Sequence, residues 1–145
     1  MRTLFLSLIL AVTIISCTTT SKSASSTTVT SVGKSCGMCL GKCYNGYRIN
    51  NGVVEQFSAE RLDKMESAII EKATAEQEKA FRELINLLPS NLDTYPDRIG
   101  CPDCHDQCGI QVVTSTRTIV IDPADYPTEF NKFMEKLKEM GVLNR

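Results

Sequence analysis

The sequence predicts an α+β domain in which an antiparallel sheet of two hairpins is packed on one face by two amphipathic helices and stapled by disulfides. Three observations predict it. Two pairs of β-branched or aromatic runs flank short polar turns, two other segments carry apolar residues at helical spacing, and the motif Cys-x-x-Cys-x-x-x-Cys occurs twice. The motif stands at 36–43 and at 101–108, directly before each predicted hairpin. If both hairpins share one sheet, the two cysteine triplets lie at one edge or end of it.

The first hairpin is predicted over 44–57, where Asn51-Gly52 supplies the positive φ angles that a two-residue type I′ turn requires. The runs on either side of this turn carry Tyr, Ile, Val and Phe. The second hairpin is predicted over 110–121, whose two β-branched runs are joined by Ser115-Thr116. It is the strongest strand signal in the chain.

The first helix is predicted over 75–88, because Thr74 and Gln77 have the spacing of a capping box and a proline follows the last turn. The second is predicted over 127–140 and ends at Gly141. Each helix presents one apolar face. The two faces consist of Ala80, Phe81, Leu84, Ile85 and Leu88, and of Phe130, Phe133, Met134, Leu137 and Met140.

Two segments between these elements are less regular. Residues 58–73 include apolar positions at helical spacing, and their second half, 66–73, fits a fifth strand as well as a separate helix. Residues 89–100 are rich in turn formers and are expected to form a surface loop before the second triplet.

The N-terminus predicts export. The apolar run 4–15 is too short to span a bilayer, whose hydrocarbon core is roughly 30 Å thick, but it suits the apolar region of a signal peptide. It leads into Ile14-Ile15-Ser16-Cys17, which resembles the lipobox of bacterial lipoproteins. That resemblance implies that residues 1–16 are removed and that Cys17 receives a diacylglyceryl group.

A polar linker is expected after the anchor. Of the 18 residues in 18–35, 12 are Ser or Thr, so we expect 17–35 to bury too little surface to offset its ordering entropy and to act as a tether. Such a coil reaches roughly 23 Å. The folded domain is then expected over 36–145.

Cysteine parity supports this division. The chain has seven cysteines, and assigning Cys17 to lipid leaves the even number that a disulfide framework needs. We expect at least one disulfide between the triplets, for example Cys43 to Cys101, because it closes a long loop, whereas links inside a triplet close tiny loops. The residues expected to form disulfides are Cys36, Cys39, Cys43, Cys101, Cys104 and Cys108.

The same cysteines allow other chemistry. Cys101, Cys104 and His105 match the Cys-x-x-Cys-His motif that attaches c-type haem. Cys36, Cys39, Cys101 and Cys104 resemble a split four-thiolate zinc site. Cys101 and Cys104 also have the spacing of a redox-active dithiol. Export favours the disulfide alternative, because thiols oxidise outside the cytoplasm.

Composition limits the function. The net charge is −1, and we see no basic cluster, no Trp and only one His, which argues against a nucleic-acid partner and against hydrolytic catalysis. We expect no enzymatic activity and no cofactor. The expected role is binding or structural, in contact with the membrane through Cys17 and with a protein or ligand that the sequence does not identify. An exported redox, metal-binding or haem-binding protein is the alternative.

The order of these features resembles certain small Cys-rich bacterial lipoproteins that are known as domains of unknown function. The resemblance rests on the lipobox, the polar tether, the run from Cys39 to Tyr44 and the closing amphipathic helix, and it covers most of 36–143. It implies the fold and a location in the cell envelope. Thr18 lacks the charge of an Asp retention signal, which by analogy implies the outer membrane, facing the periplasm.

Overall fold

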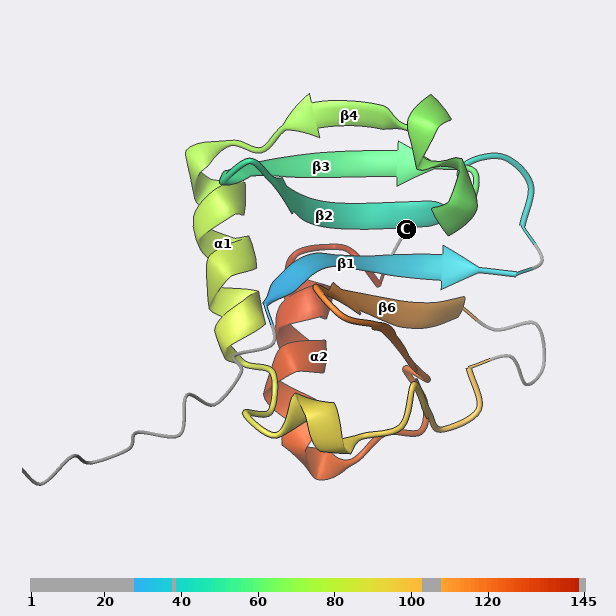
Figure 1. Cartoon of the computed structure of the whole chain (residues 1–145), viewed down its shortest axis with the longest axis vertical. Helices are drawn as coiled ribbons and strands as arrows, with labels where there is room; N and C mark the ends of the chain where they lie inside the picture. The colour runs from blue at the N-terminus through green and yellow to red at the C-terminus, as the bar shows by residue number, and fades with distance from the viewer. Residues whose placement is uncertain (1–27, 38, 103–107, 144–145) are drawn as a thin grey trace, which may run out of the picture.

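The protein is described by a computed structural model over residues 28–37, 39–102 and 108–143. Within these ranges the chain forms one seven-stranded sheet in the order β4-β3-β2-β1-β6-β7-β5, together with two α-helices (Figure 1). The α+β class is therefore as predicted. The strands are β1 (Val29–Cys36), β2 (Tyr44–Asn50), β3 (Val53–Ala59), β4 (Ile69–Lys72), β5 (Arg98–Ile99), β6 (Cys108–Thr114) and β7 (Thr118–Ile121). The helices are α1 (Ala75–Asn86) and α2 (Asn131–Glu139), with 3-10 turns η1 (Leu62–Ser67), η2 (Leu92–Thr94) and η4 (Thr128–Phe130).

The central strand, β1, corrects the expected boundary between tether and domain. Residues 29–36 belong to the sheet, where they pair with β2 on one side and β6 on the other. The expectation of a tether over 17–35 is therefore wrong for its last part. Val29 and Val32 are buried in the core. Hydrogen bonding on both sides and this burial offset the ordering entropy, an effect that average composition does not reveal.

Both predicted hairpins are present. β2 and β3 connect through Asn51 and Gly52, whose φ angles of 48° and 80° are those of the expected type I′ turn. β6 and β7 form the second antiparallel pair. Because β1 lies between β2 and β6, the two hairpins share one sheet without being neighbours.

The sheet is mixed, whereas the sequence predicted an antiparallel one. β5 pairs parallel with β7, through Arg98 opposite Val120 and Ile99 opposite Ile121. β5 comes from the segment 89–100 that was expected to be a loop. A strand of two residues is too short to show the alternation from which strands are predicted.

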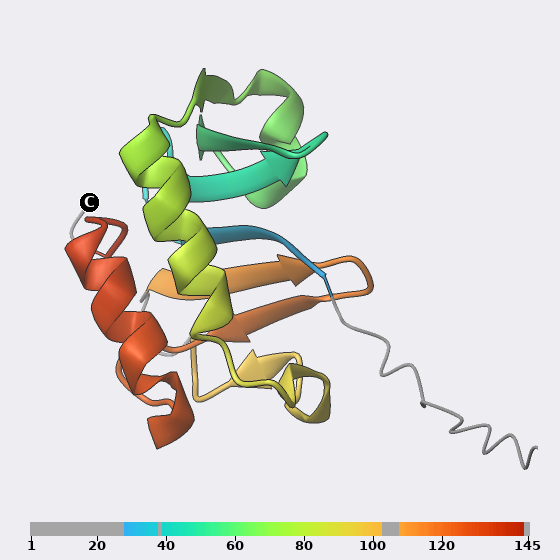
Figure 2. The ribbon, with the colours of Figure 1, turned by 90° about the vertical axis from the view of Figure 1, so that its left-hand side faces the viewer.

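The two helices lie on one face of the sheet, as Figures 1 and 2 show. At the start of α1, Thr74 Oγ1 accepts from Gln77 N at 3.2 Å and Thr74 N donates to Gln77 Oε1 at 2.9 Å, which confirms the capping box. α2 begins later than predicted, because η4 precedes it, and Gly141 follows it with φ 71°. Among the described residues, no helix combines the length and apolar composition needed to span a bilayer.

The ambiguous segment 66–73 contains the fifth strand that was one of its two expected states. β4 pairs with the outer side of β3, and η1 precedes it. η1 lies on the opposite face from the helices, where Met65 and Ala68 pack against a small second core of Tyr44, Phe57 and Ala59 (Figure 2). The two helices thus cover one face as predicted, and η1 covers part of the other face near β2 and β3. We call this second face the open face.

Candidate functional site at the cysteine end and open face of the sheet

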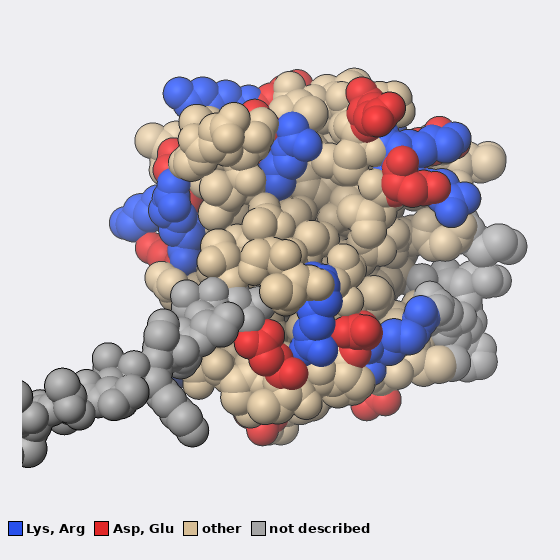
Figure 3. Space-filling view, in the orientation of Figure 1, with Lys and Arg blue, Asp and Glu red and all other residues tan. Residues whose placement is uncertain are grey.

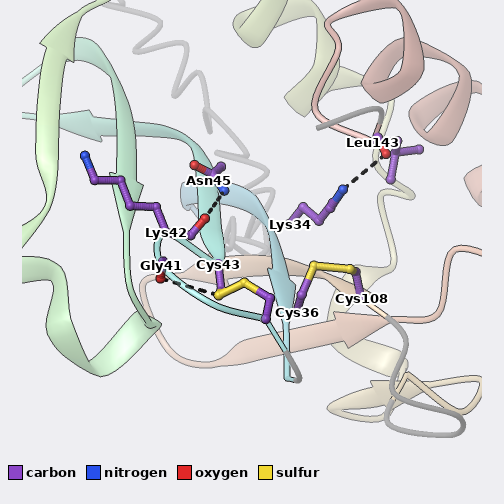
Figure 4. The surroundings of a disulfide bond; sticks show 9 residues. Lys34, Cys36, Gly41, Lys42, Cys43, Asn45, Cys108 and Leu143 are labelled. Atoms are coloured by element: carbon purple, nitrogen blue, oxygen red, sulfur yellow. Dashed lines mark hydrogen bonds between the residues drawn. A yellow bond between two sulfur atoms is a disulfide. The ribbon is translucent and has the colours of Figure 1, made fainter.

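The two cysteine triplets meet at one end of the sheet, because neighbouring strands carry them. Cys36 ends β1, Cys43 directly precedes β2, and Cys108 begins β6. Cys36 and Cys108 are opposite each other in the β1–β6 ladder, with Cα atoms 4.0 Å apart, and form a disulfide (Figure 4). The predicted covalent link between the triplets is thus present. It does not join Cys43 to Cys101, which was the example considered.

A second disulfide joins Cys39 to Cys43, within the first triplet. It closes a loop with a sequence separation of only 4, at whose tip Leu40 is fully exposed. Cys43 is buried, and the Asn45 side chain donates to the backbone carbonyl of Lys42 at 2.9 Å (Figure 4). The loop is therefore attached to the start of β2 and presents one apolar side chain to solvent.

The second triplet is described only at its ends. Cys101 is disulfide-bonded, and its backbone N–H donates to the buried carboxylate of Asp122 at 3.2 Å. Cys104 and His105 lie outside the described residues, as does the predicted lipid attachment site, Cys17. Asp122 also accepts from the backbone N–H of Ala124, so this carboxylate holds the chain around Cys101 against the end of β7.

The disulfides bear on the metal and haem alternatives. Cys36, Cys39 and Cys101, three of the four cysteines of the thiolate site considered above, are in disulfides. Zinc and haem both need these sulfurs in a reduced form, as thiolates or as thioethers formed from thiols. In the part of the chain that the structure describes, no group of three or more His, Cys, Asp or Glu side chains is placed to hold a metal ion. In this oxidised form the described cysteines act as crosslinks.

The open face carries a groove between η1 and the central strands, and Leu62 borders both of its parts. One part, of about 220 Å³, lies over the start of β1, and the other, of about 680 Å³, lies over its end. The first is lined by residues that include Ser31, Tyr44, Arg48, Met65 and Val113, and the second by residues that include Ser35, Cys36, Arg61, Asp63 and Gln111. The Gln111 Oε1 atom is buried and has no hydrogen-bond partner within the described structure. Sequence reasoning missed this groove, because it depends on β1.

Among the exposed apolar side chains of the described residues, Leu62 borders this groove. Of the large apolar residues that are exposed in the described part of the chain, Leu40 lies on the disulfide loop and the others lie on β3, η1 and β4. Two of these, Leu62 on the connection between β3 and β4 and Ile70 on β4, lie on the open face, and we call them the β3–β4 patch. Ile69 is opposite Ser58 in the β3–β4 ladder and therefore points to the helix face, and Val53 lies at the hairpin end of β3. Figure 3 views this side of the molecule and shows acidic and basic side chains interspersed around uncharged surface. Neither sign of charge dominates it.

The charged side chains that line the groove are in ion pairs, of which one is Arg61 with Asp63, at 3.1 Å. Arg48 Nε lies 2.7 Å from Glu55 Oε2 across the β2–β3 ladder. Burial raises the pKa of the Tyr44 phenol, although its hydroxyl lies within hydrogen-bonding distance of Ser31 Oγ, at 3.4 Å, which acts in the other direction. A raised pKa keeps this phenol protonated at neutral pH. The groove therefore offers apolar contacts, ion-paired side chains and neutral hydrogen-bonding groups.

Comparison of the chain with protein-family models, with characterised proteins and with solved structures finds no match. The resemblance to small Cys-rich lipoproteins therefore stays an expectation from the sequence.

Proposed function

We propose that this protein is a lipid-anchored protein of the bacterial cell envelope whose disulfide-stapled domain binds another macromolecule without catalysing a reaction. The β3–β4 patch carries the proposal. Apolar side chains that are grouped at one place on a surface favour association, because covering them removes about 25 cal/mol per Å² from contact with water. Leu62 of this patch borders the groove, whose lining includes ion-paired side chains and neutral hydrogen-bonding groups and suits recognition of a partner surface.

The proposed location is supported by the cysteines. The lipobox-like run from Ile14 to Cys17 provides the anchor, and the remaining cysteines are even in number. Disulfides such as Cys36–Cys108 persist in oxidising compartments, so their presence favours a domain outside the cytoplasm. In a host with two membranes, Thr18 in place of an Asp favours the outer membrane, with the domain facing the periplasm.

Replacement of Cys17 tests the anchor. Cells that express a Cys17→Ser variant should incorporate no radiolabelled fatty acid into this chain, and the variant should move from the membrane to the soluble fraction. The unchanged chain, grown and fractionated in parallel, is the control. Label that persists in the variant would refute the lipid attachment.

Crosslinking in intact cells tests the binding role. A photoreactive residue in place of Lys64, which lies on η1 beside Leu62, should give a covalent product larger than the 16.0 kDa chain. The product should disappear when Leu62→Glu is added. The same photoreactive residue in place of Lys79, on the exposed side of α1, is the matched control and should give no product. Equal products from both positions, or none from Lys64, would contradict the proposal.

The alternative role, in redox chemistry or metal binding, is favoured by the Cys39–Cys43 disulfide, because Cys39 is exposed and the loop it closes is very short. The mass of the intact, non-reduced mature protein separates the two roles. A mass that shows all six remaining cysteines oxidised, with no added haem or zinc, supports crosslinks alone. Free thiols or bound metal in the exported protein would favour the alternative.

A further inference from the structure

Among the described residues, no strand pairs with the outer side of β4, and this edge carries apolar side chains. β4 is the outermost strand on its side, and all four of its residues are exposed (Figures 1 and 2). Ile69 is 50% exposed and Ile70 is 40% exposed. The opposite edge, β5, has only two residues. An edge strand with exposed apolar side chains is a template for pairing with another strand.

The hydrogen-bond alternation of β4 shows which backbone groups point outward. Ala73 N donates to Val54 O at 3.0 Å, so Ala73 faces β3. In an antiparallel ladder every second residue bonds to the same neighbour, so Glu71 and Ile69 also face β3. The backbone N–H and C=O groups of Ile70 and Lys72 are therefore directed away from the sheet.

We propose that β4 pairs antiparallel with β4 of a second copy of this chain, around a two-fold axis that passes through Ile70. The inference rests on the proposed binding role and names a second copy as a partner. In this register the two Ile70 residues exchange backbone hydrogen bonds, and their side chains meet on the open face. The two seven-stranded sheets then form one continuous sheet.

The charges of β4 exclude the registers centred on Glu71 and on Lys72. A two-fold axis between antiparallel strands of one sheet is perpendicular to that sheet, so residues that are opposite each other point to the same face. An axis at Glu71 would place Glu71 opposite itself, and an axis at Lys72 would place Lys72 opposite itself. Like charges in these positions are destabilising. An axis at Ile69 would place Ile70 opposite Ala68 of the second copy, whose N–H already donates to Met65 O, so that register forms fewer backbone hydrogen bonds than the one at Ile70. With the axis at Ile70, Ile69 is opposite Glu71 of the second copy, and Lys72 is opposite Ala68 of the second copy.

The neighbouring elements leave this edge accessible. η1 precedes β4 and packs on the open face, against Tyr44 and Phe57. α1 follows β4 and packs on the other face, where the Gln77 side chain donates to Gln56 Oε1 at 3.3 Å. Neither element therefore lies across the outer side of β4. If both copies are anchored in one membrane, their effective concentration rises, which favours even a short ladder.

Sedimentation velocity of the expected mature chain, residues 17–145, carrying Cys17→Ser tests the proposal, because neither an acyl chain nor the apolar run 4–15 can then drive association. We expect a monomer–dimer equilibrium whose dimer fraction grows up to about 1 mM, as for a small interface. Ile70→Lys should weaken dimerisation by about tenfold or more, since it replaces an apolar pair on the axis with two like charges. Val53→Lys is the matched control, because Val53 is equally exposed, at 39%, on a strand that is not at the edge, and it should leave dimerisation unchanged.

A second variant keeps the test independent of side-chain charge. Lys72→Pro removes an outward N–H without breaking the β3–β4 ladder, so it should weaken dimerisation while the circular dichroism spectrum stays the same. A monomer at every concentration, or equal weakening by Ile70→Lys and Val53→Lys, would overturn the inference. The crosslinking experiment at position 64 distinguishes this failure from a failure of the proposed binding role. If the protein is monomeric but position 64 crosslinks to a different protein, the binding role stands. If position 64 gives no crosslink, the binding role is refuted.

Discussion

The two described disulfides should contribute very differently to stability, although both lie at the same end of the sheet. We predict that the double variant Cys36→Ala/Cys108→Ala is much less stable than Cys39→Ala/Cys43→Ala. Each double variant removes one crosslink and leaves four cysteines besides Cys17. The pairs therefore differ mainly in the length of chain that each disulfide closes.

The magnitudes follow from the loop lengths. The sequence separations are 72 for Cys36–Cys108 and 4 for Cys39–Cys43. The chain-entropy relation assigns about 4.4 kcal/mol to the longer link and about 1.9 kcal/mol to the shorter at 25 °C. The difference, about 2.5 kcal/mol, is a large share of the 5–15 kcal/mol by which domains of about this size are usually stable.

Urea unfolding followed by far-ultraviolet circular dichroism measures this difference, since the chain has no Trp. The free energy of unfolding of a small protein falls by about 1–3 kcal/mol per M of urea. The urea midpoint of the Cys36/Cys108 variant should therefore lie about 1–2.5 M below that of the Cys39/Cys43 variant. The comparison of midpoints holds when the free energy of unfolding depends equally steeply on urea concentration in both variants. Equal midpoints, or a lower midpoint for the Cys39/Cys43 variant, would refute the loop-length reasoning.

Three further experiments test the packing of the core, the approach of two strands and the burial of a phenol. Phe133→Ala removes a fully buried ring and should cost about 3–5 kcal/mol in thermal or urea unfolding, whereas Lys136→Ala, which loses surface ion pairs, should barely move the midpoint. Gly46→Ala should cost about 1–3 kcal/mol or more, because its Cβ would collide with the backbone of β1, while Gly37→Ala should be tolerated, since a Cβ there meets nothing. The Tyr44 phenol has an ordinary pKa of about 10 in the unfolded chain and a raised pKa in the folded chain. As the pH rises between these two values, only the unfolded state loses the proton, so the free energy of unfolding should fall. Tyr44→Phe should reduce that fall, which urea unfolding at several pH values measures.

The elements that were predicted correctly depend on contacts between residues that are close in sequence. The turn at Asn51-Gly52 needs only positive φ angles, and the start of α1 needs only the reciprocal hydrogen bonds of Thr74 and Gln77. The apolar faces of both helices follow from spacing alone, because a helix brings residues three or four apart onto one side. The parity of the cysteines likewise predicted a crosslinked domain.

The elements that were missed depend on neighbours far away in the chain. The serines and threonines of β1 resemble a linker until β2 and β6 supply hydrogen bonds on both sides. Once β1 is central, its register with β6 places Cys36 opposite Cys108, and that placement selects one disulfide among the alternatives that the sequence left open. Local propensity could determine the turns, helix starts and amphipathic faces of this protein by itself. The central strand, the pairing of Cys36 with Cys108 and the position of β4 at one end of the described strand order were determined only by the assembled sheet, because each depends on which segments, some of them distant in sequence, become neighbours.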